Sequence, residues 1–207
     1  MRPEDLRNVR PGFGDPARGS QAVFRCALRA LSHPGQPVDL PAVAQLPTSG
    51  HGAAALLLLT LLDSDCTLWL SPSLANSDAQ TWLRFHTGCR CVHDPAQAGF
   101  LWLAAGDAWP NLAALDAGND EYPDQSATCV MEVQLLPAGN AAWALEGPGI
   151  QSRQDLAVQG LPADFESQWD ANHASFPRGV DVFLTTLTQV IGLPRSTRLT
   201  RKDTVEA

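Results

Sequence analysis

Two cysteines and a histidine occupy every second position near the middle of the chain. Cys89, Cys91 and His93 belong to the segment RFHTGCRCVHDP, which runs from Arg84 to Pro95. Thiolate sulfur and imidazole nitrogen are common zinc ligands, and paired cysteines also carry out redox chemistry. The spacing therefore leaves three alternatives, namely a metal site, a redox site, or a β-strand that packs its cysteines in the protein interior.

The spacing argues against a metal site. Residues two apart on a strand point to the same face and stand about 6.6 Å apart along the chain. Two sulfurs on one zinc must lie within about 4 Å of each other, because each is about 2.3 Å from the ion. Three residues on one straight strand do not converge that closely, and no CxxC or HxxxH motif occurs to complete a site. We therefore predict no metal here.

The redox alternative lacks an activating group in the sequence. A reactive thiol usually lies at a helix N-terminus or beside a basic group. Arg90 is the basic residue adjacent to Cys89 and Cys91, and on a strand it points to the opposite face. The other three cysteines lie in apolar segments, where cysteine packs as a small hydrophobic residue. The sequence favours a structural role for the pair.

Several enzyme classes lack their motifs. No G-x-S-x-G elbow, phosphate-binding P-loop or G-x-G-x-x-G turn occurs. Pyridoxal phosphate (PLP) enzymes need a lysine for the Schiff base, and the one lysine, Lys202, lies near the C-terminus. We therefore assign no catalytic residue and predict no cofactor.

The remaining polar residues in apolar surroundings are candidates for contacts with an anion or a partner. They are Arg84, His86, Arg178, Asp181 and Arg195. Guanidinium groups match the oxygens of a phosphate or phosphonate. The alternative is that these side chains form internal salt bridges and helix-end contacts, and the sequence favours that alternative.

The elements that must position these residues follow from hydrophobic periodicity and turn signals. Helices alternate with strands in the first half, which predicts one α/β domain with a mixed sheet flanked by helices. Helices are predicted at residues 20–31, 53–62, 78–85, 109–115 and 163–174, with a further one beginning within 186–191. Strands are predicted at 37–40, 66–70, 89–92, 100–104, 128–136, 141–146, 156–158 and 180–185, with PAGN joining the strands at 128–136 and 141–146 as a hairpin.

The chain ends differ in composition from the centre. Residues 1–19 are rich in Pro, Gly and Arg and are predicted to form a flexible arm, whereas residues 199–207 form a tail. Residues 20–198 form the predicted domain. The N-terminus has no apolar core of a signal peptide, which predicts a cytoplasmic location.

Charge is unevenly distributed. The chain has 14 basic and 22 acidic residues, for a net charge of −8, and no Lys or Arg occurs between Cys91 and Ser152. An acidic chain is a poor partner for nucleic acid or an anionic membrane. The acidic stretch is either a solvated face, which we favour, or a docking face for a basic partner.

Five segments in a fixed order carry a family resemblance. They are FRCALRALSHPGQPVDL (24–40), LRFHTG (83–88), GPGI (147–150), FPRGVDVFLT (176–185) and LPRSTR (193–198). Together they resemble the H subunit of the bacterial carbon–phosphorus (C–P) lyase system for phosphonate use. The resemblance spans about Ser20 to Arg198, but Cys89 and Cys91 are not part of its pattern.

The resemblance implies a fold like the large domain of PLP-dependent transferases, without PLP. It also implies a homodimer that joins the G, I and J subunits in a core complex. With G, I and the L subunit, the H subunit supports synthesis of ribose 1-phosphonate 5-triphosphate from a nucleoside triphosphate and an alkylphosphonate. We therefore expect a non-catalytic or assisting subunit. The alternative is a stand-alone phosphonate- or nucleotide-binding protein or enzyme that uses the arginines and His86 named above.

Overall fold

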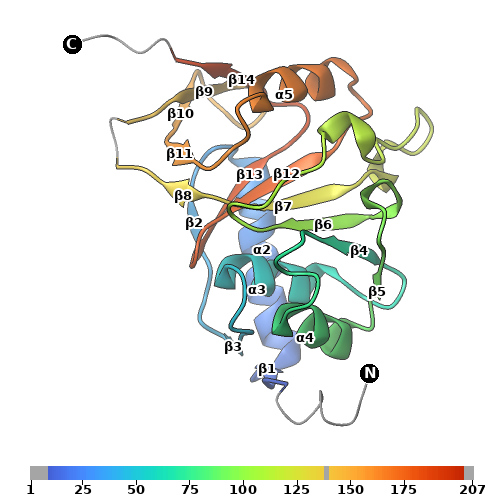
Figure 1. Ribbon diagram of the computed structural model, residues 1–207. Helices are drawn as coiled ribbons and strands as arrows, with labels where there is room; N and C mark the ends of the chain where they lie inside the picture. The colour runs from blue at the N-terminus through green and yellow to red at the C-terminus, as the bar shows by residue number, and fades with distance from the viewer. Residues whose placement is uncertain (1–8, 138–139, 203–207) are drawn as a thin grey trace.

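The computed structural model describes residues 9–137 and 140–202 and builds them around one seven-stranded sheet (Figure 1). Five neighbouring strands pair in parallel, and the two pairings at one end are antiparallel. In order across the sheet the strands are β2 (Val38–Asp39), β13 (Gln189–Leu193), β12 (Asp181–Thr185), β7 (Thr128–Glu132), β6 (Phe100–Leu103), β4 (Thr67–Leu70) and β5 (Arg90–Cys91). This confirms the predicted mixed sheet.

Both faces of the sheet are buried. In β6, Leu101 and Leu103 pack into one apolar cluster, whereas Trp102 packs into the other. The same alternation occurs in β7, β12 and β13, because successive side chains of a strand point to opposite faces. Strands covered on both sides need apolar residues at nearly every position, which explains their uninterrupted apolar runs.

Three helices cover one face of the sheet. They are α2 (Pro16–Ser32), α3 (Gly52–Leu61) and α4 (Asp78–Thr87). Helix α3 is apolar on all sides because it is enclosed, with residues 53–58 buried. Helix α2 lies directly on β13, where a Cβ atom at Gly192 would stand 2.4 Å from the backbone oxygen of Ala30. This close approach requires glycine.

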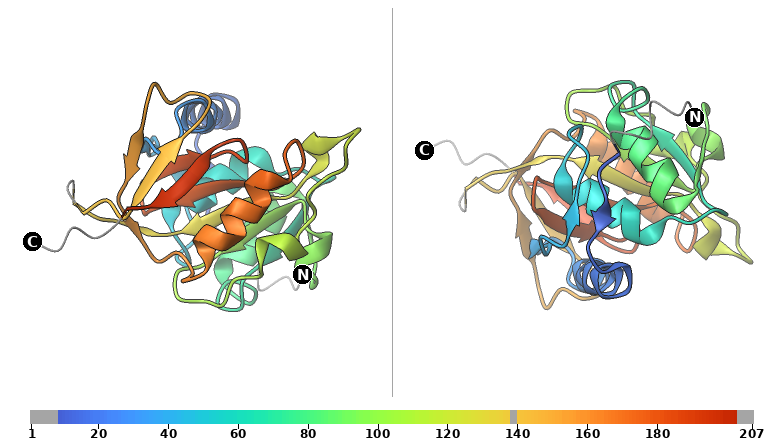
Figure 2. Two further views of the ribbon diagram at one scale, coloured as in Figure 1. Left: turned by 90° about the horizontal axis from the view of Figure 1, so that it is seen from above. Right: turned by 90° about the horizontal axis from the view of Figure 1, so that it is seen from below.

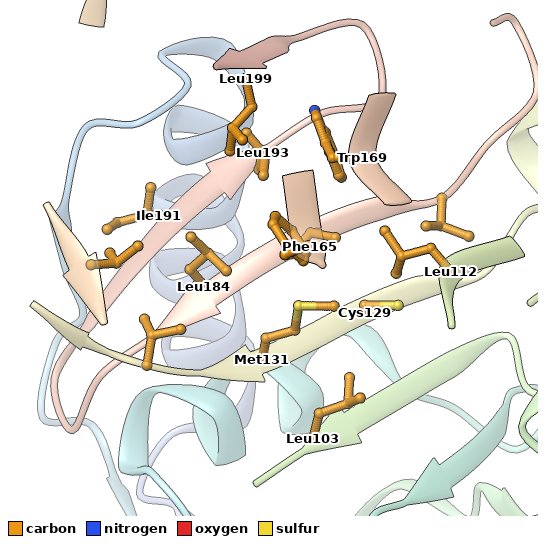
Figure 3. Packing of buried hydrophobic residues seen from close by; sticks show 14 of the residues in the cluster. Leu103, Leu112, Cys129, Met131, Phe165, Trp169, Leu184, Ile191, Leu193 and Leu199 are labelled. Carbon is orange, nitrogen blue, oxygen red and sulfur yellow. The ribbon is translucent and has the colours of Figure 1, made fainter. Parts of the chain in front are cut away.

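Helix α5 (Phe165–Ala174) covers the opposite face and buries Phe165 and Trp169 (Figure 3). The indole Nε1 of Trp169 donates a hydrogen bond of 2.8 Å to the Thr197 carbonyl. A three-stranded sheet packs beside α5 and contributes Leu199 to the same cluster. Its strands, in order, are β10 (Gln154–Leu156), β9 (Trp143–Glu146) and β14 (Arg198–Arg201). Figure 2 shows α2 and α5 on opposite sides of the large sheet.

Short elements complete the chain. Strand β1 (Gly12–Phe13) pairs with β3 (Ala44–Gln45), and β8 (Gln134–Leu135) pairs with β11 (Val158–Gln159). Three single turns of 3₁₀-helix occur at η1 (Pro95–Gln97), η2 (Leu112–Ala114) and η3 (Pro123–Gln125).

Most of the predicted strands and helices of the large sheet layer are confirmed to within a few residues. They are the helices at 53–62, 78–85 and 163–174 and the strands at 37–40, 66–70, 89–92, 100–104 and 180–185. The strand predicted at 156–158 is present as parts of β10 and β11. The predicted helix at 109–115 is wrong, because only the single turn η2 forms there.

The predicted hairpin is also wrong. Strand β7 lies in the middle of the large sheet, so both of its edges are already paired with β6 and β12. The segments that flank PAGN therefore find other partners: β8 pairs with β11, and β9 pairs with β10 and β14. Residues 138 and 139 of the PAGN turn lie outside the described residues.

The further helix predicted within 186–191 is a strand instead. Thr186 accepts hydrogen bonds from the backbone N–H groups of Thr188 and Gln189 through its hydroxyl, which closes a tight turn. The chain then reverses into β13, whose β-branched Val190 and Ile191 suit a strand.

The first helix begins earlier than predicted. Asp15 caps α2 by accepting a hydrogen bond of 3.1 Å from the backbone N–H of Arg18, and Pro16 occupies the first turn. Ser20, the predicted cap, lies inside the helix, where its hydroxyl donates to the Pro16 carbonyl. Helix α2 and β1 thus extend into the predicted arm, and β14 extends into the predicted tail. Residues 1–8 and 203–207 lie outside the described residues.

Within residues 9–137 and 140–202, no helix combines the length and the apolar character needed to cross a membrane.

Candidate functional site

Helix α4 and strand β5 position the first group of predicted site residues at one edge of the sheet. The helix begins after Ser77, whose hydroxyl accepts a hydrogen bond from the backbone N–H of Ala79. It ends at Gly88, which has the left-handed conformation that closes a helix. The chain then enters β5 at once, so Arg84 in the last helical turn lies close to Cys91, whereas His86 in the same turn packs against the N-terminal segment.

His86 holds the N-terminal segment against α4. Its Nε2 lies 2.8 Å from the Arg10 carbonyl oxygen, and the Trp82 indole donates to the same oxygen at 3.0 Å. Because a carbonyl only accepts, Nε2 carries the proton. The imidazole ring also makes edge contacts with Trp82 and Phe85. The described contacts of His86 therefore anchor the chain before β1.

Arg84 lines a cavity of about 510 Å³ beside β5. The side chains around this cavity carry positive charge and sulfur but include no carboxylate, although the chain as a whole is acidic. Its lining residues are Gln80, Arg84, Gly88, Cys89, Arg90, Cys91 and His93.

Arg195 is bound on all sides by its own chain. Its Nε and Nη2 atoms donate to the two oxygens of Asp181 at 3.1 and 2.6 Å. Its other guanidinium contacts are with the carbonyls of Pro123 and Pro177 and with the hydroxyl of Ser126. A guanidinium has five N–H groups, and these five contacts match them. The arrangement corresponds to the internal salt bridge that the sequence left as an alternative.

Arg178 lies at the surface and pairs with Asp120 at 3.3 Å. Both side chains are more than half exposed, so this pair contributes little to stability. Arg178 and Arg195 lie near the start of β12, whereas Arg84 and His86 precede β5. Strand β5 lies four inter-strand steps from β12 across the sheet. At about 4.8 Å per step, the two groups are on the order of 19 Å apart. The structure does not bring the predicted residues into one site.

A second polar cluster lies at the carboxyl end of β7, the edge where α/β sheets usually bind ligands. Glu132 is buried there and accepts three hydrogen bonds. The donors are the backbone N–H of His51 at 2.6 Å, the Trp102 indole at 2.9 Å and the backbone N–H of Ala105 at 3.1 Å. Such a carboxylate is satisfied by the protein itself and joins β7 to β6 and to the loop before α3.

His51 and Asp78 fasten the same loop. His51 Nδ1 donates to the Thr185 carbonyl at 3.0 Å, and its Nε2 lies 3.9 Å from Glu132 Oε2. On the outer side, Asp78 accepts from the backbone N–H groups of Thr48 and Ser49 and from the Thr48 hydroxyl. Together they hold residues 48–51 across the ends of the parallel strands.

Sequence reasoning missed this carboxyl-edge cluster. One signal was available, since Glu132 is an acid inside the apolar run CVMEV of a predicted strand. The partner His51 carries no such signal, because GHG before a helix is compatible with an ordinary turn. Across the part of the chain that the structure describes, no group of three or more His, Cys, Asp or Glu side chains is arranged to hold a metal ion.

The fold and its polar clusters define an α/β protein built around one large mixed sheet, in which most of the conspicuous charged groups bind to the chain itself. The particular family follows from comparison with known proteins. Residues 11–200 match the family described as bacterial phosphonate metabolism protein (PhnH), and the chain belongs to that family.

Two curated relatives align over most of their length. One is the alpha-D-ribose 1-methylphosphonate 5-triphosphate synthase subunit PhnH of Rhizobium meliloti (strain 1021), which is 38% identical over 92% of this chain and 94% of its own. The other is the putative C-P lyase subunit protein HtxG of Stutzerimonas stutzeri, which is 35% identical over 88% of this chain and 86% of its own. The family expectation from the sequence is confirmed.

Proposed function

We propose that this chain is an assisting subunit of a C–P lyase complex and supports the formation of ribose 1-phosphonate 5-triphosphate without catalysing it alone. The observation that carries the proposal is the alignment with a synthase subunit over 94% of that relative. The geometry agrees with an assisting role, since Arg195 and Glu132 are both occupied by internal hydrogen bonds.

Genetic replacement tests this role. In a bacterium that lacks its own H subunit gene, the chain is expected to restore growth on methylphosphonate as the sole phosphorus source. Growth on inorganic phosphate serves as the control, because it does not need C–P bond cleavage. Failure to restore growth, with the protein present at normal levels, would contradict the proposal.

The proposed partners are the G, I and J subunits, with L joining for the synthase step. Co-expression of a tagged copy of this chain with the G, I and J subunits, followed by affinity purification, is expected to recover all three in fixed ratio. Recovery of the tagged chain alone would contradict the assembly, even where the purified chain is folded.

We also propose that the isolated chain is a cytoplasmic homodimer without PLP, related in fold to the large domain of PLP-dependent transferases. Lys202, the one lysine, supports the cofactor-free part because its Nζ lies 2.6 Å from Asp155 at the surface. Absorbance at the aldimine band in the purified protein, lost in Lys202→Ala, would contradict it. Light scattering after gel filtration measures the dimer, and cell fractionation the location.

The cavity beside Arg84 favours one alternative, a protein that binds phosphonates or nucleotides by itself. Arg84 and Arg90 give that cavity a positive lining. Calorimetric titration of the isolated chain with ATP and with methylphosphonate separates the two functions. Binding that disappears in Arg84→Gln would favour the alternative, whereas no heat of binding favours the assisting subunit.

A further inference from the structure

Cys91 occupies an unusual position at the edge of the large sheet. It lies between two cavities, the one of about 510 Å³ beside Arg84 and a second of about 320 Å³ beside Trp69. Gln80, Cys91 and His93 line both cavities. Cys91 is partly buried, whereas its neighbour Cys89 is buried and only 3% exposed. Both line the larger cavity, but the Cys91 side chain is the more accessible of the two to small molecules.

The surroundings of Cys91 favour its thiolate form. The neighbouring Cys89 thiol and the Gln80 amide, acting as hydrogen-bond donors, lower the pKa of the Cys91 thiol. Arg84 and His93 act in the same direction, and together these groups outweigh the effect of burial and hold the pKa of Cys91 below that of an ordinary thiol. The same hydrogen bond and burial raise the pKa of Cys89, which stays a thiol.

Helix α4 supplies the groups that the sequence did not reveal. Only Arg90 is adjacent to the cysteines in sequence, but Gln80 and Arg84 reach Cys91 from the helix that packs beside β5. The charged and titratable groups around the cysteine pair are Arg84 from α4, Arg90 and His93 from the β5 segment and Cys66 just before β4. Arg90 lines the cavity, although the strand pattern predicts that it points to the opposite face. No carboxylate lines either cavity.

We propose that Cys89 and Cys91 form a hydroperoxide-sensitive pair in which Cys91 is the attacking thiolate and Cys89 resolves it. The Cys91 thiolate attacks the O–O bond of a hydroperoxide, which with one proton yields a sulfenic acid and an alcohol or water. The Cys89 thiol then attacks the sulfenic sulfur, and the disulfide forms with loss of one water. The two sulfurs together lose two electrons, and a dithiol reductant restores both thiols.

The position of the pair at the edge of the sheet allows this bond. Cys91 ends β5 and Cys89 immediately precedes it. Cα atoms two apart in an extended chain are at most about 6.6 Å apart, which is at the upper end of the range of about 4.4–6.8 Å for a disulfide, so the two side chains must lean together. Strand β5 comprises two residues and pairs on one side only, with β4. A small backbone adjustment there disturbs few hydrogen bonds.

The pH dependence of alkylation tests the thiolate. In the reduced full-length protein, iodoacetamide labelling of each cysteine is followed by peptide mass spectrometry at pH 6 and pH 8. The Cys91 rate is expected to fall by less than about tenfold between pH 8 and pH 6, whereas an ordinary thiol loses about 100-fold over that range. The partly buried Cys26 and Cys66 are internal controls, because burial raises the pKa of both thiols.

Oxidation tests the pair. One equivalent of hydrogen peroxide is expected to produce the Cys89–Cys91 disulfide, which dithiothreitol reverses. In Cys89→Ser the sulfenic acid should persist and react with dimedone at Cys91, and Arg84→Gln should slow the first step at pH 6. A Cys91 rate that falls as steeply with pH as that of Cys26 would overturn the proposal. So would peroxide oxidation spread evenly over the five cysteines.

Discussion

Glu132 shows how much one side chain can organise at the ends of the parallel strands. Its carboxylate binds a loop amide, an indole and a second backbone amide, while exposing almost no surface to solvent. Removing one member of a buried polar network leaves the others without partners, which costs more than the hydrogen bond itself gained.

Glu132→Gln is expected to lower the free energy of unfolding by about 2–4 kcal/mol. The amide that replaces one oxygen cannot accept a hydrogen bond, so a backbone N–H such as that of Ala105 loses its acceptor. Urea denaturation measures the loss. Glu146→Gln is the matched control, because Glu146 is exposed and its change should stay within about 0.5 kcal/mol. Equal losses in the two variants would refute the network.

Asp78 connects stability to pH through the same loop. Partial burial alone would raise the pKa of Asp78. The hydrogen bonds from Ser49 and Thr48 together have the larger effect and lower that pKa from the usual 3.8 to about 2. A folded-state pKa below the unfolded value stabilises the protein above about pH 4, and that contribution is lost as pH falls toward about 2.

We expect Asp78→Asn to be less stable than the parent by about 1–2 kcal/mol at pH 7, since solvent screens this exposed carboxylate. The gap between the two proteins should close between pH 4 and pH 2. Urea midpoints measured at a series of pH values give both quantities. Asp164→Asn is the control, because Asp164 makes no capping hydrogen bond with its side chain. A gap that stays constant down to pH 2 would contradict the assignment.

At the scale of elements, the contact of α2 with β13 depends on one missing side chain. Gly192 lets the helix backbone near Ala30 lie against the strand. Gly192→Ala is expected to destabilise the protein by about 2–3 kcal/mol, because the new methyl group must push the helix away. Thermal unfolding measures the effect. Gly14→Ala is the control, since a Cβ there meets nothing within 4 Å, and a similar loss in both variants would refute the tight packing.

The elements themselves could largely be predicted from the sequence, because periodicity and turn residues are local signals. Strand partners could not, since pairing depends on which edges of the sheet are free. Strand β7 illustrates this, as its central place excluded the hairpin that its sequence suggested.

The environment of Cys91 could not be predicted from the sequence either, because Arg84 and Gln80 approach it from another element. His51 and Glu132 lie 81 residues apart, and no local pattern joins them.

At the scale of the whole molecule, the acidic stretch between Cys91 and Ser152 divides into two kinds of residue. Five of its eight acids bind to the chain itself, namely Asp94, Asp107, Asp116, Asp120 and Glu132. The other three are exposed, namely Glu121, Asp124 and Glu146. Most of this negative charge therefore caps turns or pairs with a neighbour at the surface, and Glu132 is the buried acid among the eight.

One apolar surface on α2 is a candidate interface for the proposed homodimer. Phe24 and Leu28 lie one helical turn apart and are 45% and 52% exposed. The double variant Phe24→Ser, Leu28→Ser is expected to weaken association at least about tenfold. It removes apolar area on α2 that a second copy would bury in the dimer. Light scattering across a concentration series measures association.

Leu187→Ser provides the comparison for that experiment. Leu187 is 69% exposed and lies in the turn between β12 and β13. The variant Leu187→Ser therefore also replaces an exposed apolar side chain by serine, but at a position outside α2. An unchanged dimer in the α2 double variant would place the interface elsewhere on the molecule.

The short strands at the two ends of the large sheet have a consequence for how copies of this protein can assemble. Both β2 and β5 comprise two residues, so each end presents few free backbone groups to which another chain could add a strand. Growth of the sheet from molecule to molecule, the route to fibres, is thereby blocked at both ends. Association is then left to side-chain surfaces, and the symmetry of those contacts decides whether an assembly closes.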